Sequence, residues 1–231
     1  MERTAEIKDI KDILRGLNLK IEKNAHEDSN TDITEKLERF KAGLEKNIQS
    51  VLQKTGVPKM FLNPKSNTAK LDLGRGYYFS GPVGTGKTDM AVSVLRSIIL
   101  NTEPVFEYGV YKLPENLAMF VSVPMMLLNI RSSFKSESAD EMDLIKKYVK
   151  PEILVMDDLG TEKVTEWVMQ TLYVIINSRY EEEKQTLITS NNSLDEIRKN
   201  LNDKIASRIT AMTEIIELKG IDRRSGISVV K

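Results

Sequence analysis

Residues 81–88 read Gly-Pro-Val-Gly-Thr-Gly-Lys-Thr, a complete G-x-x-x-x-G-K-[ST] phosphate-binding loop. An apolar, strand-like segment precedes it at 76–80 and a helix-like segment follows from residue 89, which is the context that the motif requires. Its glycines let backbone N–H groups turn toward phosphate oxygens, and the following helix adds partial positive charge there. An ordinary glycine-rich turn is the alternative, but eight matching positions in this context favour binding of a nucleoside triphosphate.

The loop also predicts which side chains meet the phosphates. Lys87 can reach the β- and γ-phosphates, and the Thr88 hydroxyl can ligate Mg²⁺. The residues expected to bind the nucleotide are Gly81, Pro82, Val83, Gly84, Thr85, Gly86, Lys87, Thr88 and Asp89.

The composition of the chain limits its possible partners and its cellular compartment. The 231 residues carry 34 basic and 34 acidic side chains, so no net charge attracts the chain to nucleic acid and any DNA contact must come from a local groove. Cysteine is absent, which excludes disulfides and thiolate metal sites and fits a reducing compartment. Because no apolar run approaches membrane-spanning length and no signal peptide is evident, we expect a cytoplasmic protein without a membrane partner.

The first 55 residues are predicted to form a helical segment that binds a partner. Apolar residues recur at helical spacing over 5–17 and again over 33–51, and the polar stretch 23–32 between them is expected to be a linker. A capping box at Asp32 predicts the start of the second helix, and Gly56 predicts its end.

Residues 56–231 are predicted to form the nucleotide-binding domain, with 56–72 as the connector into it. From residue 73 onward, apolar strands alternate with helical stretches, which implies an α/β fold with a parallel sheet covered by helices on both faces. The strand candidates are Tyr77–Ser80, Ala118–Val123, Ile153–Asp157, Thr186–Ser190 and Glu214–Leu218, and the helical candidates are 87–101, 124–134, 140–149, 163–182 and 194–211. Ligands of such sheets bind at the carboxyl ends of the strands.

Polar residues end two of these strands. Asp157 is placed to hold Mg²⁺, directly or through water, and Asp158 is placed to orient or activate an attacking water. Asn191 could bond that water or the γ-phosphate, with its neighbour Asn192 as the competing candidate. The alternatives are a strand followed by an acidic turn and an asparagine-rich turn.

Three arginines are candidates for an arginine finger, a guanidinium that one subunit donates to the γ-phosphate of its neighbour. Arg208 lies near the end of a short amphipathic stretch, and Arg179 and Arg224 are further candidates. The alternative for each is a solvated arginine on the surface.

Together these motifs resemble the AAA+ ATPases of the bacterial replicative-helicase loader group, the DnaC/DnaI type, and transposition helper ATPases of the IstB type are similar. The resemblance covers about residues 55–225, and it is carried by 81–88, Ile153–Glu162, Asn177–Glu181, Thr186–Asn191, Lys204–Ile209 and Glu217–Ser225. The pair Asp157-Asp158, where most AAA+ proteins carry Asp-Glu, looks characteristic of this group.

The resemblance implies a P-loop NTPase of AAA+ type, with a five-stranded parallel sheet in the order 5-1-4-3-2. It assigns Asn191 as sensor 1, Arg208 as the arginine finger and Arg224 as sensor 2. It also implies binding of ATP and Mg²⁺, weak hydrolysis in isolation, self-association into a ring or spiral on single-stranded DNA, and a replicative hexameric helicase as partner. Since only 13 residues follow the last strand candidate, no C-terminal helical lid is expected, and without cysteine there is no DnaI-type zinc module.

Three functions stay open on the sequence alone. The chain could be an ATP-driven helicase loader in DNA replication, a transposition helper ATPase that partners a transposase and binds duplex DNA, or an adaptor whose nucleotide is only a structural switch. Within 124–150, the cations that could contact DNA phosphates are Arg131, Lys135, Lys146 and Lys147; a solvated amphipathic helix pair is the alternative.

Overall fold

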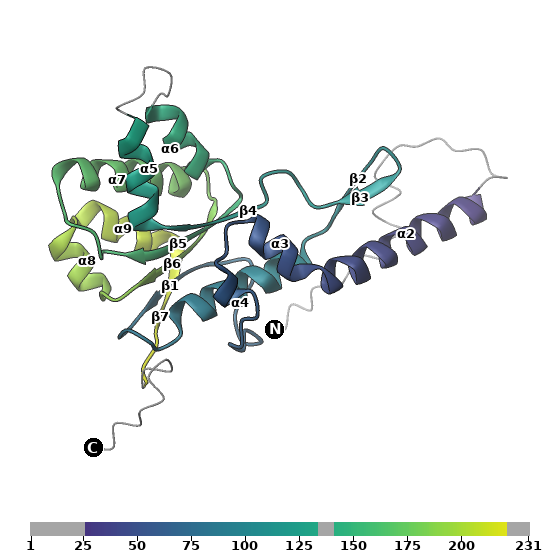
Figure 1. The fold of residues 1–231 in the computed structure, drawn as a ribbon, viewed down its shortest axis with the longest axis horizontal. Coiled ribbons are helices and arrows are strands. Elements are labelled where there is room, and N and C mark those ends of the chain that lie inside the picture. Colours follow the sequence, from purple (N-terminus) through teal and green to yellow (C-terminus); the bar gives the residue numbers. More distant parts are fainter. Residues whose placement is uncertain (1–25, 134–140, 221–231) are drawn as a thin grey trace, which may run out of the picture.

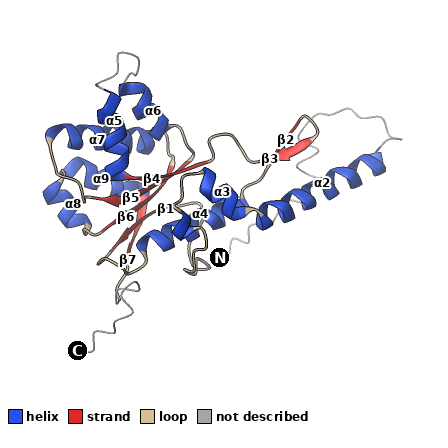
Figure 2. Ribbon diagram, viewed as in Figure 1, coloured by secondary structure: helices blue, strands red, loops and turns tan. Residues whose placement is uncertain are grey.

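The computed structural model describes residues 26–133 and 141–220, and its centre is a five-stranded parallel sheet in the order β4-β5-β6-β1-β7 (Figures 1 and 2). The strands are β1 (Gly76–Ser80), β4 (Ala118–Ser122), β5 (Ile153–Leu159), β6 (Gln185–Ser190) and β7 (Thr213–Glu217). In terms of the five predicted strands this order is 2-3-4-1-5, which is 5-1-4-3-2 read from the other edge. The predicted α/β fold and strand order are therefore confirmed.

Two apolar cores lie on opposite faces of this sheet because side chains alternate along each strand. Tyr78 packs in one core, while Tyr77 and Phe79 pack in the other. The first face is covered by α5 (Val123–Ser133), α6 (Glu141–Val149), α7 (Glu166–Glu181), α8 (Leu194–Asn200) and α9 (Asp203–Met212), and the second by α3 (Ile48–Lys54) and α4 (Lys87–Asn101). Burial on both faces explains why the central strand β5 begins with an unbroken apolar run, Ile153–Met156.

The predicted helix over 194–211 is wrong in one respect, because the structure divides it into α8 and α9. Asn202 begins the second of these helices: its Oδ1 accepts the backbone N–H groups of Lys204 at 2.7 Å and Ile205 at 3.3 Å. An asparagine that caps a helix start in this way interrupts an otherwise continuous helical pattern.

The prediction of a linker over 23–32 is wrong for residues 26–32, because α2 runs from His26 to Lys46. This helix projects from the body of the molecule (Figure 1), and a helix surrounded by solvent needs no apolar face along that part. Asp32 lies inside the helix and pairs with Lys36 one turn later, so it does not begin a capping box. The predicted helix over 5–17 lies outside the described residues.

A two-stranded hairpin between α4 and β4 has no counterpart among the predicted elements. Its strands are β2 (Val105–Glu107) and β3 (Val110–Lys112), and Tyr108 and Gly109 join them with φ of 52° and 81°, as a tight hairpin turn requires. Strands of three residues are too short to show a period along the sequence. The hairpin contacts α2 and lies on the same side of the molecule (Figure 1).

Within 26–133 and 141–220, no helix has the length and apolar character needed to cross a bilayer. The expectation that no helical lid follows β7 concerns residues 221–231, which lie outside the described part of the chain.

Arg179 on α7 is fully buried and joins two segments, residues 148–152 at and after the end of α6 and the start of β6. Its guanidinium donates to the carbonyl oxygens of Val149, Pro151 and Gln185 at 3.1, 2.7 and 2.6 Å, and its Nε donates to the Thr186 hydroxyl at 2.9 Å. Burial lowers the pKa of Arg179 to about 10, so the side chain is still charged at neutral pH. Both expectations for this residue, a finger and a solvated arginine, are wrong.

Replacing Arg179 by methionine is expected to lower the melting temperature by about 10 °C or more, because several buried carbonyls lose their donor. The measurement is thermal unfolding followed by circular dichroism. Arg198→Met is the matched control: Arg198 is half exposed and pairs with Asp195 and Asp203 at the surface, so its loss should change the melting temperature by no more than about 2 °C. Equal melting temperatures for the two variants would contradict the structural role of Arg179.

Candidate nucleotide-binding site

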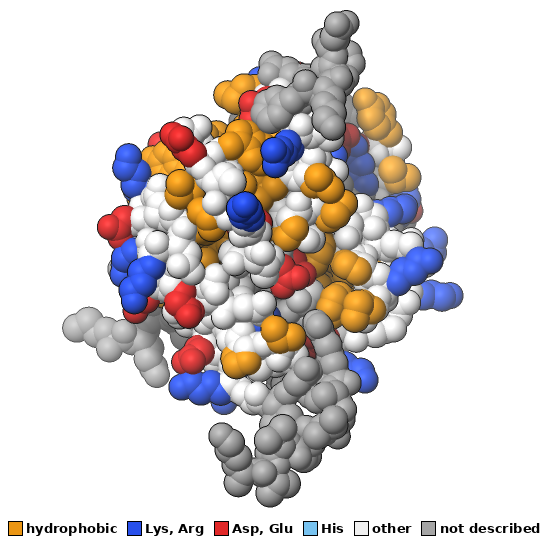
Figure 3. Space-filling model, turned by 60° about the vertical axis from the view of Figure 1, so that its left-hand side comes forward, with side chains coloured by type: hydrophobic (Ala, Val, Ile, Leu, Met, Phe, Trp, Pro, Cys, Tyr) orange, Lys and Arg blue, Asp and Glu red, His pale blue; other side chains and the backbone are white. Residues whose placement is uncertain are grey.

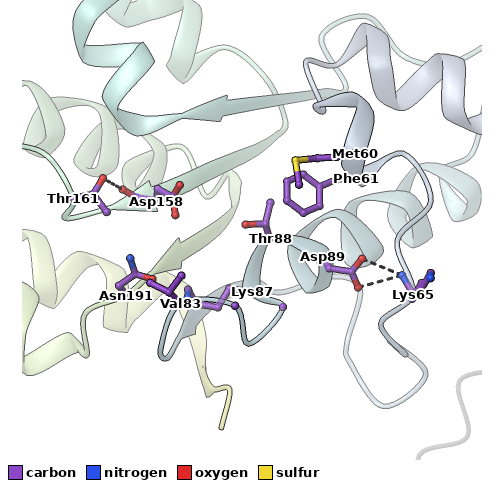
Figure 4. Close-up of a pocket in the computed structure, with 12 residues that line it drawn as sticks. Met60, Phe61, Lys65, Val83, Lys87, Thr88, Asp89, Asp158, Thr161 and Asn191 are labelled. Atoms are coloured by element: carbon purple, nitrogen blue, oxygen red, sulfur yellow. Dashed lines mark hydrogen bonds between the residues drawn. The ribbon is translucent and has the colours of Figure 1, made fainter. Parts of the chain in front are cut away.

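A pocket of about 470 Å³ lies at the carboxyl ends of β1, β5 and β6, where a parallel sheet binds its ligands. The residues that line it are Met60, Phe61, Lys65, Val83, Gly84, Gly86, Lys87, Thr88, Asp89, Asp158, Thr161 and Asn191 (Figure 4). The phosphate-binding loop, one acid of the tandem pair and the asparagine after β6 therefore meet at one place.

The loop between β1 and α4 forms one wall of this pocket. Gly84 and Gly86 have φ of 80° and 95°, a conformation that turns successive N–H groups to one side and that glycine adopts without strain. The Lys87 ammonium donates to the carbonyl oxygens of Gly81 and Pro82, at 2.8 Å each. Because α4 begins at Lys87, its N-terminal N–H groups and dipole add positive potential at the same wall.

Three further loop positions shape the pocket. The Thr85 hydroxyl donates to the Pro82 carbonyl at 2.9 Å, and this bond closes the loop from inside. The Asp89 carboxylate accepts the backbone N–H group of Lys65 at 3.1 Å (Figure 4) and that of Ser66 at 2.9 Å. Asp89 therefore fastens the connector to the start of α4, and this anchoring role was not part of its predicted role as a nucleotide ligand.

Asp157 lies beneath the loop and is bound by two hydroxyls. Its Oδ1 accepts from Thr88 Oγ1 at 2.9 Å and from Thr189 Oγ1 at 2.7 Å. A carboxylate and a hydroxyl this close are hard oxygen donors of the kind that Mg²⁺ prefers, and phosphate oxygens and water complete such a coordination shell. The donor set therefore fits Mg²⁺, with Thr88 and Asp157 as the residues that would hold it.

Burial raises the pKa of Asp157, the neighbouring charge of Asp158 raises it further, and the bonds from Thr189 and Thr88 oppose both effects. A raised pKa means that the folded protein disfavours the ionised form relative to the unfolded chain. The contribution of Asp157 to stability is therefore greatest at acidic pH and is lost as the pH rises through the folded-state pKa.

Asp157→Asn is consequently expected to raise the melting temperature at neutral pH by about 2–4 °C, while it weakens Mg²⁺-dependent hydrolysis. The amide keeps the acceptor for both hydroxyls and removes the buried charge. Thermal unfolding without nucleotide measures the effect, with Asp143→Asn as a control at an exposed aspartate whose side chain is 73% accessible. A melting temperature below that of the wild type would contradict the prediction.

Asp158 reaches the pocket because the backbone turns at this residue. Consecutive strand residues point to opposite faces, but Asp158 has φ of 62° and the register of β5 against β6 shifts between Met156 and Leu159. Its N–H donates to Thr189 Oγ1 at 3.0 Å, and its carbonyl accepts from Thr161 Oγ1 at 2.9 Å. The irregularity lets both acids serve one end of the sheet.

The two candidate asparagines after β6 have different surroundings. Asn191 lines the pocket. Asn192 forms hydrogen bonds within the fold. Its side-chain amide donates to the Gly160 carbonyl at 3.1 Å, and its backbone carbonyl accepts from the Tyr78 hydroxyl at 2.7 Å. The geometry therefore favours Asn191 over Asn192 for contact with a ligand.

Arg208 is not part of this pocket. It lies on α9, where its Nε donates to Asn177 Oδ1 at 2.9 Å and its guanidinium sits 4.6 Å from the centre of the Tyr180 ring. Arg224 lies outside the described residues. Of the predicted catalytic residues, Lys87, Asp157, Asp158 and Asn191 are thus brought together and Arg208 is set apart.

Met60, Phe61, Lys65 and Thr161 line the pocket but were not predicted as site residues. The first three belong to the connector, and in Figure 4 the Met60 and Phe61 side chains lie beside Thr88. The sequence signal for this wall is a short apolar run in the connector, Met60-Phe61-Leu62. Apolar side chains here suit a flat heterocyclic base.

Among the cations considered for DNA contact, Arg131 lies on α5 and Lys146 and Lys147 on α6, all exposed, while Lys135 lies outside the described residues. Lys146 pairs with Asp143 at 3.2 Å. Figure 3 brings the left-hand side of Figure 1 forward, and on this face acidic and basic side chains are interspersed. No single-sign field dominates this view, in line with the zero net charge.

Comparison with known protein families shows to which family this domain belongs. The sequence profile of the family described as IstB-like ATP binding protein matches residues 75–225, which include the loop, both acids and Asn191. The chain belongs to the IstB-like ATP-binding family.

Relatives of this IstB-like chain work in two settings. The replicative helicase loader DnaI of Bacillus subtilis (strain 168) is 26% identical over 140 residues, which are 60% of this chain and 39% of DnaI. An ATP-binding protein in an insertion sequence of Mycobacterium tuberculosis is 26% identical over 121 residues, 52% of this chain and 42% of that protein. The chain thus matches less than half the length of these curated relatives.

Among solved structures, the crystal structure of the DnaC helicase loader superposes on the IstB-like chain with a TM-score of 0.52 and 26% identity. The superposed region is 65% of the IstB-like chain and 82% of the DnaC chain. The IstB-like domain is therefore an AAA+ P-loop ATPase domain. The individual roles of the site residues stay predictions.

Proposed function

We propose that this IstB-like protein is an ATP-dependent helicase loader that acts in DNA replication in the cytoplasm. It would bind ATP with Mg²⁺, assemble on single-stranded DNA and deliver a hexameric replicative helicase. The observation that carries the proposal is the tandem acid pair beside a complete phosphate-binding loop in a chain related to the helicase loader DnaI.

The mechanism assigns one task to each pocket residue. ATP would supply the phosphoryl group, and Mg²⁺ would neutralise the charge that develops on it. Lys87 and the N–H groups of the loop would hold the phosphates, and Thr88 and Asp157 would hold the metal. Asp158 orients or deprotonates the attacking water, and Asn191 fixes its position. Met60 and Phe61 cover the base and exclude water from it.

Arg208 is proposed to act at the nucleotide site of a neighbouring subunit. It lies on α9, apart from the pocket of its own chain, which supports donation to the γ-phosphate of the next subunit in a ring or spiral. Hydrolysis by a single subunit would then be slow, because one catalytic cation would be missing until subunits assemble.

The first 55 residues are proposed as the segment that contacts the helicase. Their described part includes α2, which projects from the ATPase domain (Figure 1) and leaves Ile33 exposed. A projecting helix can reach a partner while the nucleotide site is engaged with neighbouring subunits.

A transposition helper ATPase is the second candidate. It is favoured by the IstB-like family match and by the relative in an insertion sequence. This function predicts a transposase as partner and a preference for duplex DNA over single-stranded DNA, whereas a loader prefers single strands.

The test is helicase deposition on a single-stranded DNA circle, measured with the purified chain, the replicative helicase of the same host and ATP. A loader increases the amount of bound helicase in an ATP-dependent manner, and Asp158→Asn impairs the cycle. Binding to a transposase and to duplex DNA, without any effect on the helicase, would select the second candidate. Unimpaired deposition by Asp158→Asn, with no ATP turnover on DNA, would instead indicate a nucleotide that acts only as a structural switch.

A further inference from the structure

Arg208 is held in a cradle formed by one turn of α7. Its Nε donates to Asn177 Oδ1 at 2.9 Å, and its guanidinium carbon lies over the Tyr180 ring, 4.6 Å from the ring centre. Asn177 Nδ2 in turn donates to Glu181 Oε1 at 2.9 Å, which sets the orientation of the amide so that its oxygen faces Arg208. Three side chains of α7 therefore act on one arginine of α9.

The cradle uses only part of the hydrogen-bonding capacity of Arg208. A guanidinium has five N–H donors, one on Nε and four on the two terminal nitrogens. Within the described residues, the hydrogen bonds recorded for Arg208 involve Nε alone. Arg208 also lines a surface hollow of about 400 Å³ together with Tyr173, Lys204 and Ser207, so its side chain borders solvent.

We propose that Asn177 and Tyr180 are positioning residues for Arg208, which fix its guanidinium plane so that the terminal nitrogens face the nucleotide of an adjacent subunit. The inference rests on the proposed trans role of Arg208. A long, flexible arginine loses rotamer freedom when it engages a phosphate, and an arginine already held at Nε and against an aromatic ring has less freedom to lose. Asn177 and Tyr180 touch no substrate; they act through Arg208.

The same contacts could only stabilise the packing of α7 against α9, and this structural alternative makes a different prediction. A packing residue affects the protein whether or not Arg208 is present. A positioning residue has no effect on turnover once Arg208 has been removed. The distinction is measurable as a double-mutant cycle.

The experiment compares steady-state ATP turnover on single-stranded DNA for the wild type, Asn177→Leu, Arg208→Ala and the double variant. Asn177→Leu is expected to lower kcat about tenfold, as loss of a hydrogen bond to a charged group would, with ATP affinity unchanged. The double variant should match Arg208→Ala alone. Tyr180→Phe keeps the ring face and should retain wild-type turnover, whereas Tyr180→Leu should lower kcat about threefold.

Gln170→Leu is the matched control. Gln170 is an exposed amide on the same helix that donates to Glu166 one turn away, and among the described residues it bonds to no arginine, so kcat should not change. A further loss in the double variant, wild-type kcat in Asn177→Leu, or a weakened ATP affinity would overturn the positioning role. If Arg208→Ala itself keeps full turnover, the proposed trans role fails and the positioning role falls with it. If Arg208→Ala is impaired and Asn177→Leu is not, only the positioning role fails.

Discussion

Lys87→Ala is expected to lower ATP turnover by about a thousandfold or more and ATP affinity by about tenfold or more. Lys87 is buried at the mouth of the phosphate-binding loop, and its ammonium already lies within 2.8 Å of two loop carbonyls. No other side chain of the loop carries a positive charge, so in the alanine variant the loop has only its backbone N–H groups to hold the β- and γ-phosphates. Titration with a fluorescent ATP analogue and a steady-state turnover assay measure both effects.

Lys65→Ala is the matched control for Lys87→Ala. Lys65 lines the same pocket, but it is exposed and reaches the pocket from the connector (Figure 4), so its loss should change affinity by no more than about threefold. If Lys87→Ala keeps the full nucleotide affinity while its fold is intact, the loop is not the phosphate site. The proposed function would then lose its central observation.

The parts of this molecule that the sequence predicted are those in which local patterns and tertiary structure agree. The loop at 81–88 is a contiguous motif, and the helix that follows it begins and ends at the predicted residues 87 and 101. The central strands are buried on both faces, so their apolar runs stand out from the polar segments around them. The sheet order came from the family resemblance, not from periodicity, and the structure confirms it.

The parts that were missed depend on contacts between distant residues. Nothing local marks Arg179 as buried, because its acceptors come from the end of α6, from the segment between α6 and β5 and from the start of β6. The pocket wall at Met60 and Phe61 becomes visible only when Asp89 ties the connector to α4. The cradle of Arg208 likewise joins residues that are 31 positions apart.

Glycine 160 illustrates how such a contact constrains the site. It follows the acid pair with φ of 84°, and a Cβ there would lie 2.5 Å from the amide nitrogen of Asn192. The Asp-Asp-Leu-Gly segment and the asparagine pair after β6 are therefore packed against each other at the end of the sheet. The spacing along the chain could not reveal this contact, although each segment was predicted to belong to the site.

Arg208→Ala is expected to lower ATP turnover on single-stranded DNA by about a hundredfold or more, with ATP affinity retained, because the finger acts in the transition state and not in ground-state binding. The partner variant is Asp158→Asn, which keeps the loop and the metal ligands but cannot activate water. Asparagine also tolerates the φ of 62° at this position well. Each variant alone should therefore be folded, able to bind ATP and nearly inactive.

Mixing the two variants separates donation between subunits from action within one subunit. In a random assembly, half of the pockets belong to Arg208→Ala subunits and half of their neighbours carry an intact finger, so about a quarter of the wild-type turnover should return. A finger that serves its own subunit would restore nothing, because every chain in the mixture lacks either the arginine or the acid. Turnover at the level of the separate variants, with assembly on DNA verified by light scattering, would contradict the trans role. Recovery must also depend on protein concentration, since only neighbouring subunits can complete a site.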